Sequence, residues 1–272
     1  MNISKLKQHP HVFTRLFGID PDKFDALVED VSPLWVKAEA KRLTHARKIK
    51  KGGGQPYALT LEEVVAMLLL YARSYVTHVF LGALFDVHDS RVCRYFARLR
   101  PSVEAVFDLP VKNADLSEEE ILQLVVDATE QRTERRNTGC GYSGKKKAHT
   151  IKTQIVVDKK GIIKHISKSV PGNIHDKKLF DQSGIMLPDT ALGDLGYLGT
   201  NLIVPFKSSK LHKLTKRQKD WNTRHSRKRI IVEHVFASLK AFRILADRFR
   251  GLLVHYHHYF LIVCGLRNLA IS

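Results

Sequence analysis

Three acidic residues stand out in a chain that is otherwise strongly basic. The 272 residues include 45 Lys and Arg against 27 Asp and Glu, which gives a formal net charge of +18. Asp127 interrupts the apolar segment VVDAT, Asp194 lies in the glycine-bounded segment GDLG, and Glu233 lies in the segment RIIVEH. A carboxylate in an apolar strand costs several kcal/mol unless it has a partner. A structural hydrogen bond or a bound cation would supply that partner.

These residue types can carry out metal-dependent phosphodiester chemistry. Magnesium prefers hard oxygen ligands, and a few carboxylates together with substrate phosphates are enough to hold it. Two such ions, about 3.5–4 Å apart, activate water and stabilise the leaving oxygen. The glycines beside Asp194 would let a ligand approach the backbone closely. Each carboxylate alone favours a structural role, whereas the three together, in their order along the chain, favour the metal site.

The surroundings of Glu233 leave two interpretations open. At about 100° per residue, Arg229, Glu233, Phe236 and Lys240 lie on one stripe of a helix. Glu233 therefore lies at a border between the apolar side and solvent, with a cation one turn before it and another two turns after it. It is either a metal-binding carboxylate flanked by phosphate-binding cations or part of a solvated helical ion pair.

The positive charge predicts a polyanionic partner, and double-stranded DNA is the expected one. Residues 207–250 contain fourteen Lys and Arg against three Asp and Glu, and Lys145, Lys146 and Lys147 form a second basic patch. No apolar run is long enough to span a membrane, and the first residues lack a signal-peptide core, so we expect a cytoplasmic protein without membrane contact. An RNA-binding module is less favoured, because only 8% of the residues are aromatic.

The elements expected to position the acidic residues follow from periodicity. Three antiparallel strands are predicted over residues 121–129, 150–157 and 162–170. They are followed by a helix near 175–183, short strands at 191–194 and 202–206, a helix over 227–248 and a last helix over 252–269, which would close the core of this domain.

The N-terminal region has a different, helical pattern. Thr60 and Glu63 form a capping-box pattern at the start of a helix that runs to residue 75. Residues 77–85 and 89–100 then predict helix, short turn, helix. The first turns of the second helix place the side chains expected to contact DNA, Ser90, Arg91 and Arg94. An ordinary helical hairpin is the alternative. We expect a helical region over 1–115, with the helix-turn-helix at about 60–100, and a second domain over 116–272.

Five segments and the predicted helix-turn-helix together resemble DDE-type insertion-sequence transposases, in particular the insertion-sequence-five group with its DDE superfamily endonucleases. The segments are VVDATEQ, YSGKKKAHTIKTQ, GNIHD, GDLGYLG and RIIVEHVFASLK. The resemblance covers about residues 57–270. It implies an α+β or α/β chain in which a ribonuclease-H-like catalytic domain, a mixed five-stranded sheet with helices, follows an all-α helix-turn-helix region.

The same resemblance implies roles for individual residues. Asp127, Asp194 and Glu233 match the acidic triad that binds two Mg²⁺ or Mn²⁺ ions. Arg229 and Lys240 match basic positions around the family's glutamate, and Lys240 is expected to bind the transposon end. The family often has a tyrosine three residues before that arginine, where this chain has Ser226. The short stretch between Asp194 and Glu233 lacks the large β-rich insertion of some relatives.

The implied function is DNA transposition. The protein is expected to bind terminal inverted repeats, to hydrolyse a phosphodiester at the element end and to join the 3′-hydroxyl to target DNA by transesterification. A homodimer or higher oligomer is expected, because two ends must be brought together. Two alternatives remain: an inactive or domesticated helix-turn-helix regulator, which would bind DNA without nicking it, and a plain DNA endonuclease, which would cut without joining ends.

Overall fold

The computed structural model describes residues 1–44, 58–107, 109, 124–134, 141–209 and 213–271. The chain divides into two compact units. The first contains Met1–Asp108, Ala241–Ile244 and His258–Ser272, and the second contains Leu109–Lys240 and Leu245–His257. Two segments from late in the sequence therefore belong to the N-terminal unit. The boundary expected between residues 115 and 116 lies outside the described residues and stays a prediction.

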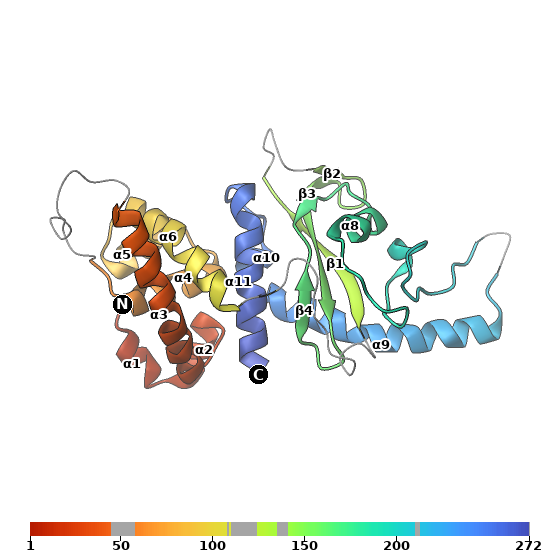
Figure 1. Cartoon of the computed structure of the whole chain (residues 1–272), viewed down its shortest axis with the longest axis horizontal. Coiled ribbons are helices and arrows are strands. Elements are labelled where there is room, and N and C mark those ends of the chain that lie inside the picture. Colours follow the sequence, from red (N-terminus) through yellow and green to blue (C-terminus); the bar gives the residue numbers. More distant parts are fainter. Residues whose placement is uncertain (45–57, 108, 110–123, 135–140, 210–212, 272) are drawn as a thin grey trace. The chain divides into compact units, whose positions relative to one another are not determined.

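The N-terminal unit is helical, as its sequence pattern predicts (Figure 1). Its helices are α1 (Ile3–Lys7), α2 (Pro10–Phe17), α3 (Pro21–Thr44), α4 (Leu61–Ser74), α5 (His78–Phe85) and α6 (Asp89–Phe107). The capping box of α4 is confirmed: the Glu63 amide donates to Thr60 Oγ1 over 3.2 Å, and the Thr60 amide donates to Glu63 Oε2 over 2.9 Å. This reciprocal pair satisfies two amide donors that the helix itself leaves unpaired.

Helices α5 and α6 form the predicted helix-turn-helix. Helix α5 ends at Asp86, which has a left-handed backbone with a φ of 54°. The turn is tight, because a Cβ added to Gly82 would lie 2.5 Å from the carbonyl oxygen of Val87. Helix α6 continues to Phe107, beyond the predicted end at residue 100 and through Pro101. Leu81 and Phe85 of α5 are buried, whereas Leu84 is 36% exposed.

The second unit is built on a five-stranded sheet. Its strands are β1 (Val125–Arg132), β2 (Gly141–Ser143), β3 (Ala148–Val157), β4 (Ile163–Ile166) and β5 (Val170–Pro171). Strand β3 pairs antiparallel with each of the other four strands. Strand β2 was not predicted, because three residues are too few to show a period of two. Residues 121–123 of the first predicted strand lie outside the described residues.

The third predicted strand, residues 162–170, is divided into β4 and β5. Beyond β4, the Ser167 amide still donates to the Gln154 carbonyl over 2.9 Å, but the Gln154 amide donates to the side-chain Oγ of Ser167 over 3.0 Å. The predicted strands at 191–194 and 202–206 are reduced to bridges, in which Leu192 pairs in parallel with Val125 and with Ile203. A 3₁₀ turn, η1 (Leu195–Tyr197), follows Asp194 and ends the extended stretch.

The remaining helices are α8 (Asp176–Ser183), α9 (Lys216–Lys240), α10 (Arg243–Ala246) and α11 (Leu253–Ile271). Helix α9 begins well before the predicted residue 227. Its start is fixed by a second capping box, in which the Thr215 amide donates to Gln218 Oε1 over 2.9 Å and the Gln218 amide donates to Thr215 Oγ1 over 3.3 Å. The predicted continuation to residue 248 is wrong, because residues 241–244 belong to the other unit.

One core cluster supports the sheet. Leu124, Val126 and Val156 of the sheet region pack in it with Phe180 of α8 and with buried residues of the segment that follows α8, namely Ile185, Leu187, Ala191, Tyr197 and Leu202. Helix α9 packs on β1. The sheet core therefore fixes the backbone on both sides of Asp127 and Asp194. Among the described residues, no helix is long and apolar enough to cross a membrane.

Candidate functional site

Asp127 and Asp194 are brought side by side by backbone pairing. The Val126 amide donates to the Leu192 carbonyl, and the Leu192 amide donates to the Leu124 carbonyl, each over 2.8 Å. In this parallel bridge Val125 lies opposite Leu192. Asp127 follows Val125 by two residues, and Asp194 follows Leu192 by two residues. Side chains two residues apart in extended chains share a face, and neighbouring chains are about 4.8 Å apart. The register therefore pairs the first two predicted triad residues.

The carboxylate of Asp127 lies in a partly buried and negatively charged setting. Burial, together with the nearby charges of Asp194 and Asp176, raises its pKa from 3.8 to about 6, and Arg229 and the Ala128 amide oppose this shift. Arg229 Nη2 donates to Asp127 Oδ2 over 2.9 Å, and the two side chains are only 14% and 21% exposed. Arg229 thus fixes one oxygen of Asp127 and partly balances its charge.

Asp194 is held at the start of η1. Its Oδ1 accepts a hydrogen bond from the Gly196 amide over 2.8 Å. A Cβ on Gly196 would lie 2.9 Å from Asp194 Oδ1 and 2.6 Å from Asp176 Oδ2. The two carboxylate oxygens therefore pack against Gly196 where a side chain would otherwise lie, and only glycine fits there.

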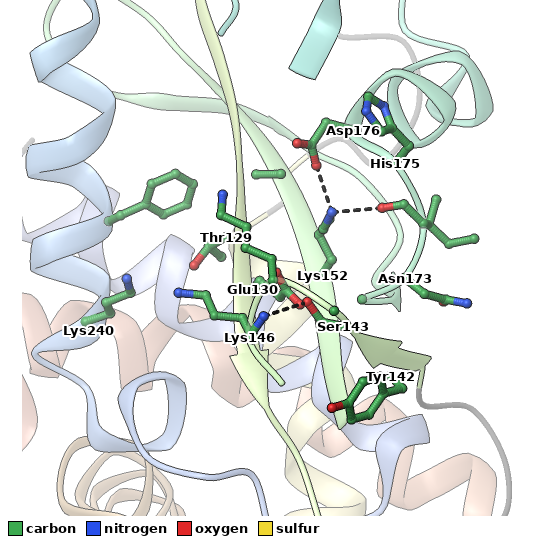
Figure 2. Close-up of a pocket in the computed structure, with 16 residues that line it drawn as sticks. Thr129, Glu130, Tyr142, Ser143, Lys146, Lys152, Asn173, His175, Asp176 and Lys240 are labelled. Atoms are coloured by element: carbon green, nitrogen blue, oxygen red, sulfur yellow. Dashed lines mark hydrogen bonds and ion pairs between the residues drawn. The ribbon is translucent and has the colours of Figure 1, made fainter. Parts of the chain in front are cut away.

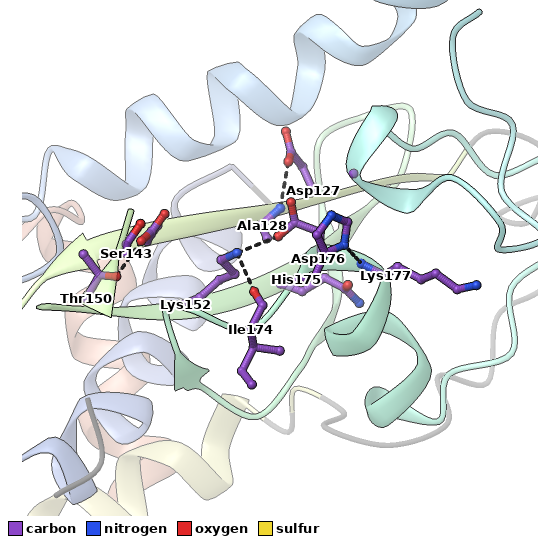
Figure 3. A network of polar contacts seen from close by, with 12 residues as sticks. Asp127, Ala128, Ser143, Thr150, Lys152, Ile174, His175, Asp176 and Lys177 are labelled. Carbon is purple, nitrogen blue, oxygen red and sulfur yellow. Dashed lines mark hydrogen bonds and ion pairs between the residues drawn. The ribbon is translucent and has the colours of Figure 1, made fainter. Parts of the chain in front are cut away.

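Asp176 is a site residue to which the sequence assigned no role. It is the first residue of α8, whose N-cap is His175. Lys152 Nζ donates to Asp176 Oδ1 over 2.9 Å and to the carbonyl oxygen of Ile174 over 2.8 Å (Figure 3). The only sequence signal for this aspartate is its place at the end of the GNIHD segment, because nothing in strand periodicity links residue 176 to residues 127 and 194.

Glu233, the third predicted triad residue, is exposed on α9. It follows Arg229 by one helical turn, a rise of about 6 Å. Because Arg229 contacts Asp127, the stripe predicted for Glu233 does pass along β1. Among the described residues, however, no three carboxylate, imidazole or thiolate groups lie close enough to hold a metal ion. The structure thus brings Asp127 and Asp194 together, and no third carboxylate among the described residues completes a metal-binding set with them.

Two adjoining pockets collect four of the predicted basic residues of this unit, Lys145, Lys146, Lys147 and Lys240. The first pocket, of about 560 Å³, is lined by Lys145, Lys146 and Lys240 and by the Lys152–Asp176 pair. Figure 2 shows Lys146, Lys240 and this ion pair. A second pocket, of about 860 Å³, shares Lys146 and Lys240 with the first. The further cations that line it are Lys147, Arg132 and Arg248. Sequence reasoning did not single out Arg132, Arg248 or Lys152, although their charge in and beside strands was a usable signal.

Lys145, Lys146 and Lys147 are exposed in the turn between β2 and β3. Helix α9 supplies Lys240 at its last residue. Cations from two elements therefore line surfaces that begin at β1, within a few residues of Asp127. Such an arrangement suits a chain of phosphate groups.

The predicted base-reading residues lie in the other unit, at the start of α6. Ser90 and Arg94 are exposed, and Arg91 is half-buried. Arg94 Nε donates to the Ser90 carbonyl, and its Nη2 donates to Ser90 Oγ, each over 3.1 Å. The guanidinium of Arg94 is thus folded back on its own helix, and contact with a base edge requires it to leave Ser90.

The site residues offer the ligand type that a divalent cation prefers, although no three of the described residues form a closed ligand set. Asp127, Asp176 and Asp194 supply carboxylate oxygens, and the cations Lys152 and Arg229 offset part of their charge. Burial is the largest cause of the raised pKa of Asp127, and the charges of Asp194 and Asp176 add to it. The buried hydroxyl of Tyr197 has no hydrogen-bond partner among the described residues.

Comparisons with known proteins cover nearly the whole chain. Residues 126–268 match the family model described as DDE superfamily endonuclease, and residues 57–107 match the helix-turn-helix of DDE superfamily endonuclease. These matches support the ribonuclease-H-like fold and the helical DNA-binding region that the sequence predicts. No solved structure matches the chain.

Two relatives extend this similarity. A protein of Microchaete diplosiphon, described as a probable transposase for insertion sequence element IS702, is 34% identical over 266 residues, which cover 92% of this chain and 91% of the relative. A protein of Streptomyces albus G, whose description also names a transposase, for insertion sequence element IS112, is 28% identical over 261 residues. These residues cover 94% of this chain and 93% of the relative.

Proposed function

Because the chain belongs to the DDE superfamily endonucleases and, among them, to the DDE-type insertion-sequence transposases, we propose that it cuts DNA at the ends of its own element and joins the freed ends to target DNA. The observation that carries this proposal is the parallel bridge between Val125 and Leu192, because it sets Asp127 beside Asp194. Two adjacent carboxylates at a basic surface suit phosphodiester cleavage.

Asp127, Asp194 and Glu233 are the proposed metal-binding and catalytic residues. Two Mg²⁺ or Mn²⁺ ions held there would supply Lewis acidity and a nucleophilic water at neutral pH. Arg229 keeps Asp127 in position through its hydrogen bond. For Glu233 to join the two aspartates, its side chain must turn from solvent toward β1, and bound DNA would favour this by neutralising the lysines nearby.

The proposed reaction has two steps. In the first, the oxygen of water forms a bond to phosphorus and the bond to the 3′ oxygen breaks, which leaves a 5′-phosphate and a 3′-hydroxyl. In the second, this hydroxyl attacks a target phosphodiester, and the target's own 3′ oxygen leaves. The proton of each attacking oxygen passes to solvent or to a site carboxylate, so no covalent enzyme–DNA intermediate is needed.

The proposed DNA contacts come from both units. Ser90, Arg91 and Arg94 would dock on the terminal inverted repeat. Lys145, Lys146, Lys147, Arg229 and Lys240 would contact phosphates close to the cleaved bond. A homodimer or higher oligomer is proposed, because joining requires two ends in one complex.

Cleavage of a duplex that carries the element's own end tests the proposal. We expect nicking at the end with Mg²⁺ or Mn²⁺ and none with a chelator. Asp127→Ala should abolish nicking while DNA binding stays within about threefold of wild type, because a single carboxylate adds little to phosphate affinity. Lys160→Ala, in the exposed turn after β3, is the matched control and should cut normally.

Retained cleavage by Asp127→Ala would contradict the proposed triad. Binding of the duplex by the wild-type protein, without nicking under any metal condition, would instead support a DNA-binding regulator. That second function has one observation in its favour, which is that no three carboxylates among the described residues lie close enough to hold a metal ion. If the protein cleaves the element end but joins no end to a plasmid target, the result would support a plain endonuclease.

A further inference from the structure

The larger of the two basic pockets combines cations with an exposed aromatic ring. This pocket, of about 860 Å³, is lined by five Lys and Arg residues and by one carboxylate, that of Glu130. Tyr142 of β2 lines this pocket and also the smaller one. We propose that the larger pocket binds an unpaired nucleotide of the DNA strand that is cut, with its base stacked on the ring of Tyr142. This inference rests on the proposed action on DNA and specifies the form of DNA that the site holds.

The ring of Tyr142 is held in place and is open to a ligand. Both neighbours of Tyr142 in β2 are buried, whereas Tyr142 itself is 57% exposed. It lies directly opposite His149 of β3, and the two rings meet edge to face, with centroids 5.7 Å apart and an interplanar angle of 76°. This contact fixes the tilt of the ring and leaves most of it uncovered. A base can therefore stack on a ring that is already positioned, which lowers the ordering cost of binding.

The turn after β2 brings two of the cations to the same pocket as Tyr142. The Lys146 amide donates to Ser143 Oγ over 3.2 Å. Lys147 has a left-handed backbone with a φ of 48°, which non-glycine residues rarely adopt. Backbone strain of this kind is concentrated at ligand-binding and active sites. Figure 2 shows Tyr142, Lys146 and Lys240 at the smaller pocket, and the two lysines line both pockets.

The lining of the larger pocket favours an unpaired nucleotide over the outer surface of a duplex. Its volume lies within the roughly 300–1,000 Å³ that ligand sites occupy. Phosphates alone would require only the cations, but Ala148, Leu245 and Ala246 add apolar surface to the wall. An aromatic ring among cations is a common means of holding single-stranded nucleic acid, because every base has a face on which a ring can stack. In a paired duplex those faces are already covered by neighbouring bases.

The alternative is that Tyr142 only packs on His149 and thereby stabilises β2. Two substitutions separate the roles. Tyr142→Leu keeps an apolar side chain opposite His149 but removes the ring, whereas Tyr142→Phe keeps the ring and removes only the hydroxyl. A packing role predicts that neither variant distinguishes paired from unpaired DNA differently from wild type. The proposed role predicts a selective loss of unpaired DNA in Tyr142→Leu alone.

Binding of the full-length protein to labelled DNA, with a chelator present so that metal-dependent cleavage cannot occur, is the direct test. One probe is the fully paired element-end duplex, and the other is the same duplex with a short unpaired 3′ end that contains 2-aminopurine. We expect Tyr142→Leu to weaken binding of the unpaired probe at least about tenfold and of the paired probe less than about twofold. Stacking should quench the 2-aminopurine fluorescence with wild type and Tyr142→Phe, and not with Tyr142→Leu.

Phe206→Leu is the matched control. It removes a ring that is 45% exposed in the same unit, and Phe206 is not among the described residues that line either pocket. This variant should bind both probes within about twofold of wild type. Thermal unfolding checks that all three variants fold.

Three results would overturn the inference. They are wild-type affinity of Tyr142→Leu for the unpaired probe, an equal loss on both probes, or a loss in Tyr142→Phe as large as in Tyr142→Leu. The proposed function fails on a different readout. If Asp127→Ala abolishes cleavage while Tyr142→Leu binds the unpaired probe normally, the function stands and this inference is wrong. If the wild type never cuts DNA but Tyr142→Leu selectively loses the unpaired probe, the inference stands and the function is wrong.

Discussion

At the scale of single residues, Asp127 combines burial with neighbouring negative charge. Burial, which is the largest cause, raises its pKa from 3.8 to about 6. A carboxylic acid with a raised pKa binds a proton more tightly in the folded than in the unfolded state. Its stabilising contribution is therefore fully present below pH 3.8 and is lost as the pH rises through about 6. Above that pH the ionised carboxylate destabilises the metal-free fold.

The upward direction of this pKa shift leads to a prediction for Asp127→Asn. At pH 8 the variant should be more stable than wild type without metal, by on the order of 3 kcal/mol, since each pKa unit corresponds to about 1.4 kcal/mol. Below pH 4 the difference should vanish, because wild-type Asp127 is then protonated as well. Thermal unfolding at the two pH values, with chelator present, measures it. A stability difference that does not depend on pH would show that Asp127 is not strained by its charge.

At the scale of elements, the helix-turn-helix depends on one close approach between backbones. A Cβ at Gly82 would lie 2.5 Å from the Val87 carbonyl oxygen and 3.3 Å from the Asp89 amide nitrogen. Neither atom belongs to a flexible side chain, so the turn itself would have to move. The positive φ of Asp86 adds to the constraint, because non-glycine residues rarely adopt that conformation.

We therefore predict that Gly82→Ala separates α5 from α6 and weakens binding to the terminal repeat at least about tenfold, with a stability loss on the order of 2 kcal/mol. Fluorescence anisotropy with a labelled duplex and chemical unfolding measure the two effects. Ala83→Ser, at the exposed next position of α5, should change neither. Normal binding by Gly82→Ala would mean that the turn geometry does not govern recognition.

Helix α9 shows how one element serves two purposes. Val232, Val235 and Leu239 are buried, whereas the stripe with Arg229 and Lys240 supplies an ion pair and a pocket cation. The periodicity of the sequence predicted this division of faces. The true start of the helix was overlooked, although Thr215 and Gln218 carry the same kind of capping signal as Thr60 and Glu63.

At the scale of the whole molecule, the C-terminal residues belong to the N-terminal unit. His258 Nδ1 lies 2.9 Å from Glu104 Oε2, and the rings of Tyr259 and Tyr71 have centroids 5.6 Å apart. The guanidinium of Arg100 lies 5.2 Å from the centroid of Tyr259. Phe260 and Leu266 are also fully buried or nearly so. The helical core thus requires residues that the chain supplies last.

We predict that a chain truncated after residue 257 loses cooperative unfolding of its helical unit, because these apolar contacts are worth several kcal/mol together. Hydrogen exchange followed by mass spectrometry should show faster exchange in α4 and α6, with the sheet of the second unit still protected. A truncation that removes only residues 270–272 is the control. Unchanged protection in α4 and α6 after the longer truncation would contradict the prediction.

The sequence by itself determined much of this protein. Charge, one capping box and periodicity predicted the helix-turn-helix, the long basic helix and the antiparallel strands. The resemblance of five motif segments indicated the family and implied the mixed sheet. All of these signals are carried by residues close together in the chain. The acidic residues Asp127 and Asp194 were also marked by their local setting, an apolar strand and flanking glycines.

Tertiary structure alone decided which distant residues meet. The parallel bridge that sets Asp127 beside Asp194, the place of Asp176 across Gly196 and the return of residues 258–271 to the helical unit all join segments far apart in sequence. Local patterns carry no information about such pairings, since many registers bury the same apolar faces. Backbone hydrogen bonds and close packing select one register, and with it which carboxylates lie near one another.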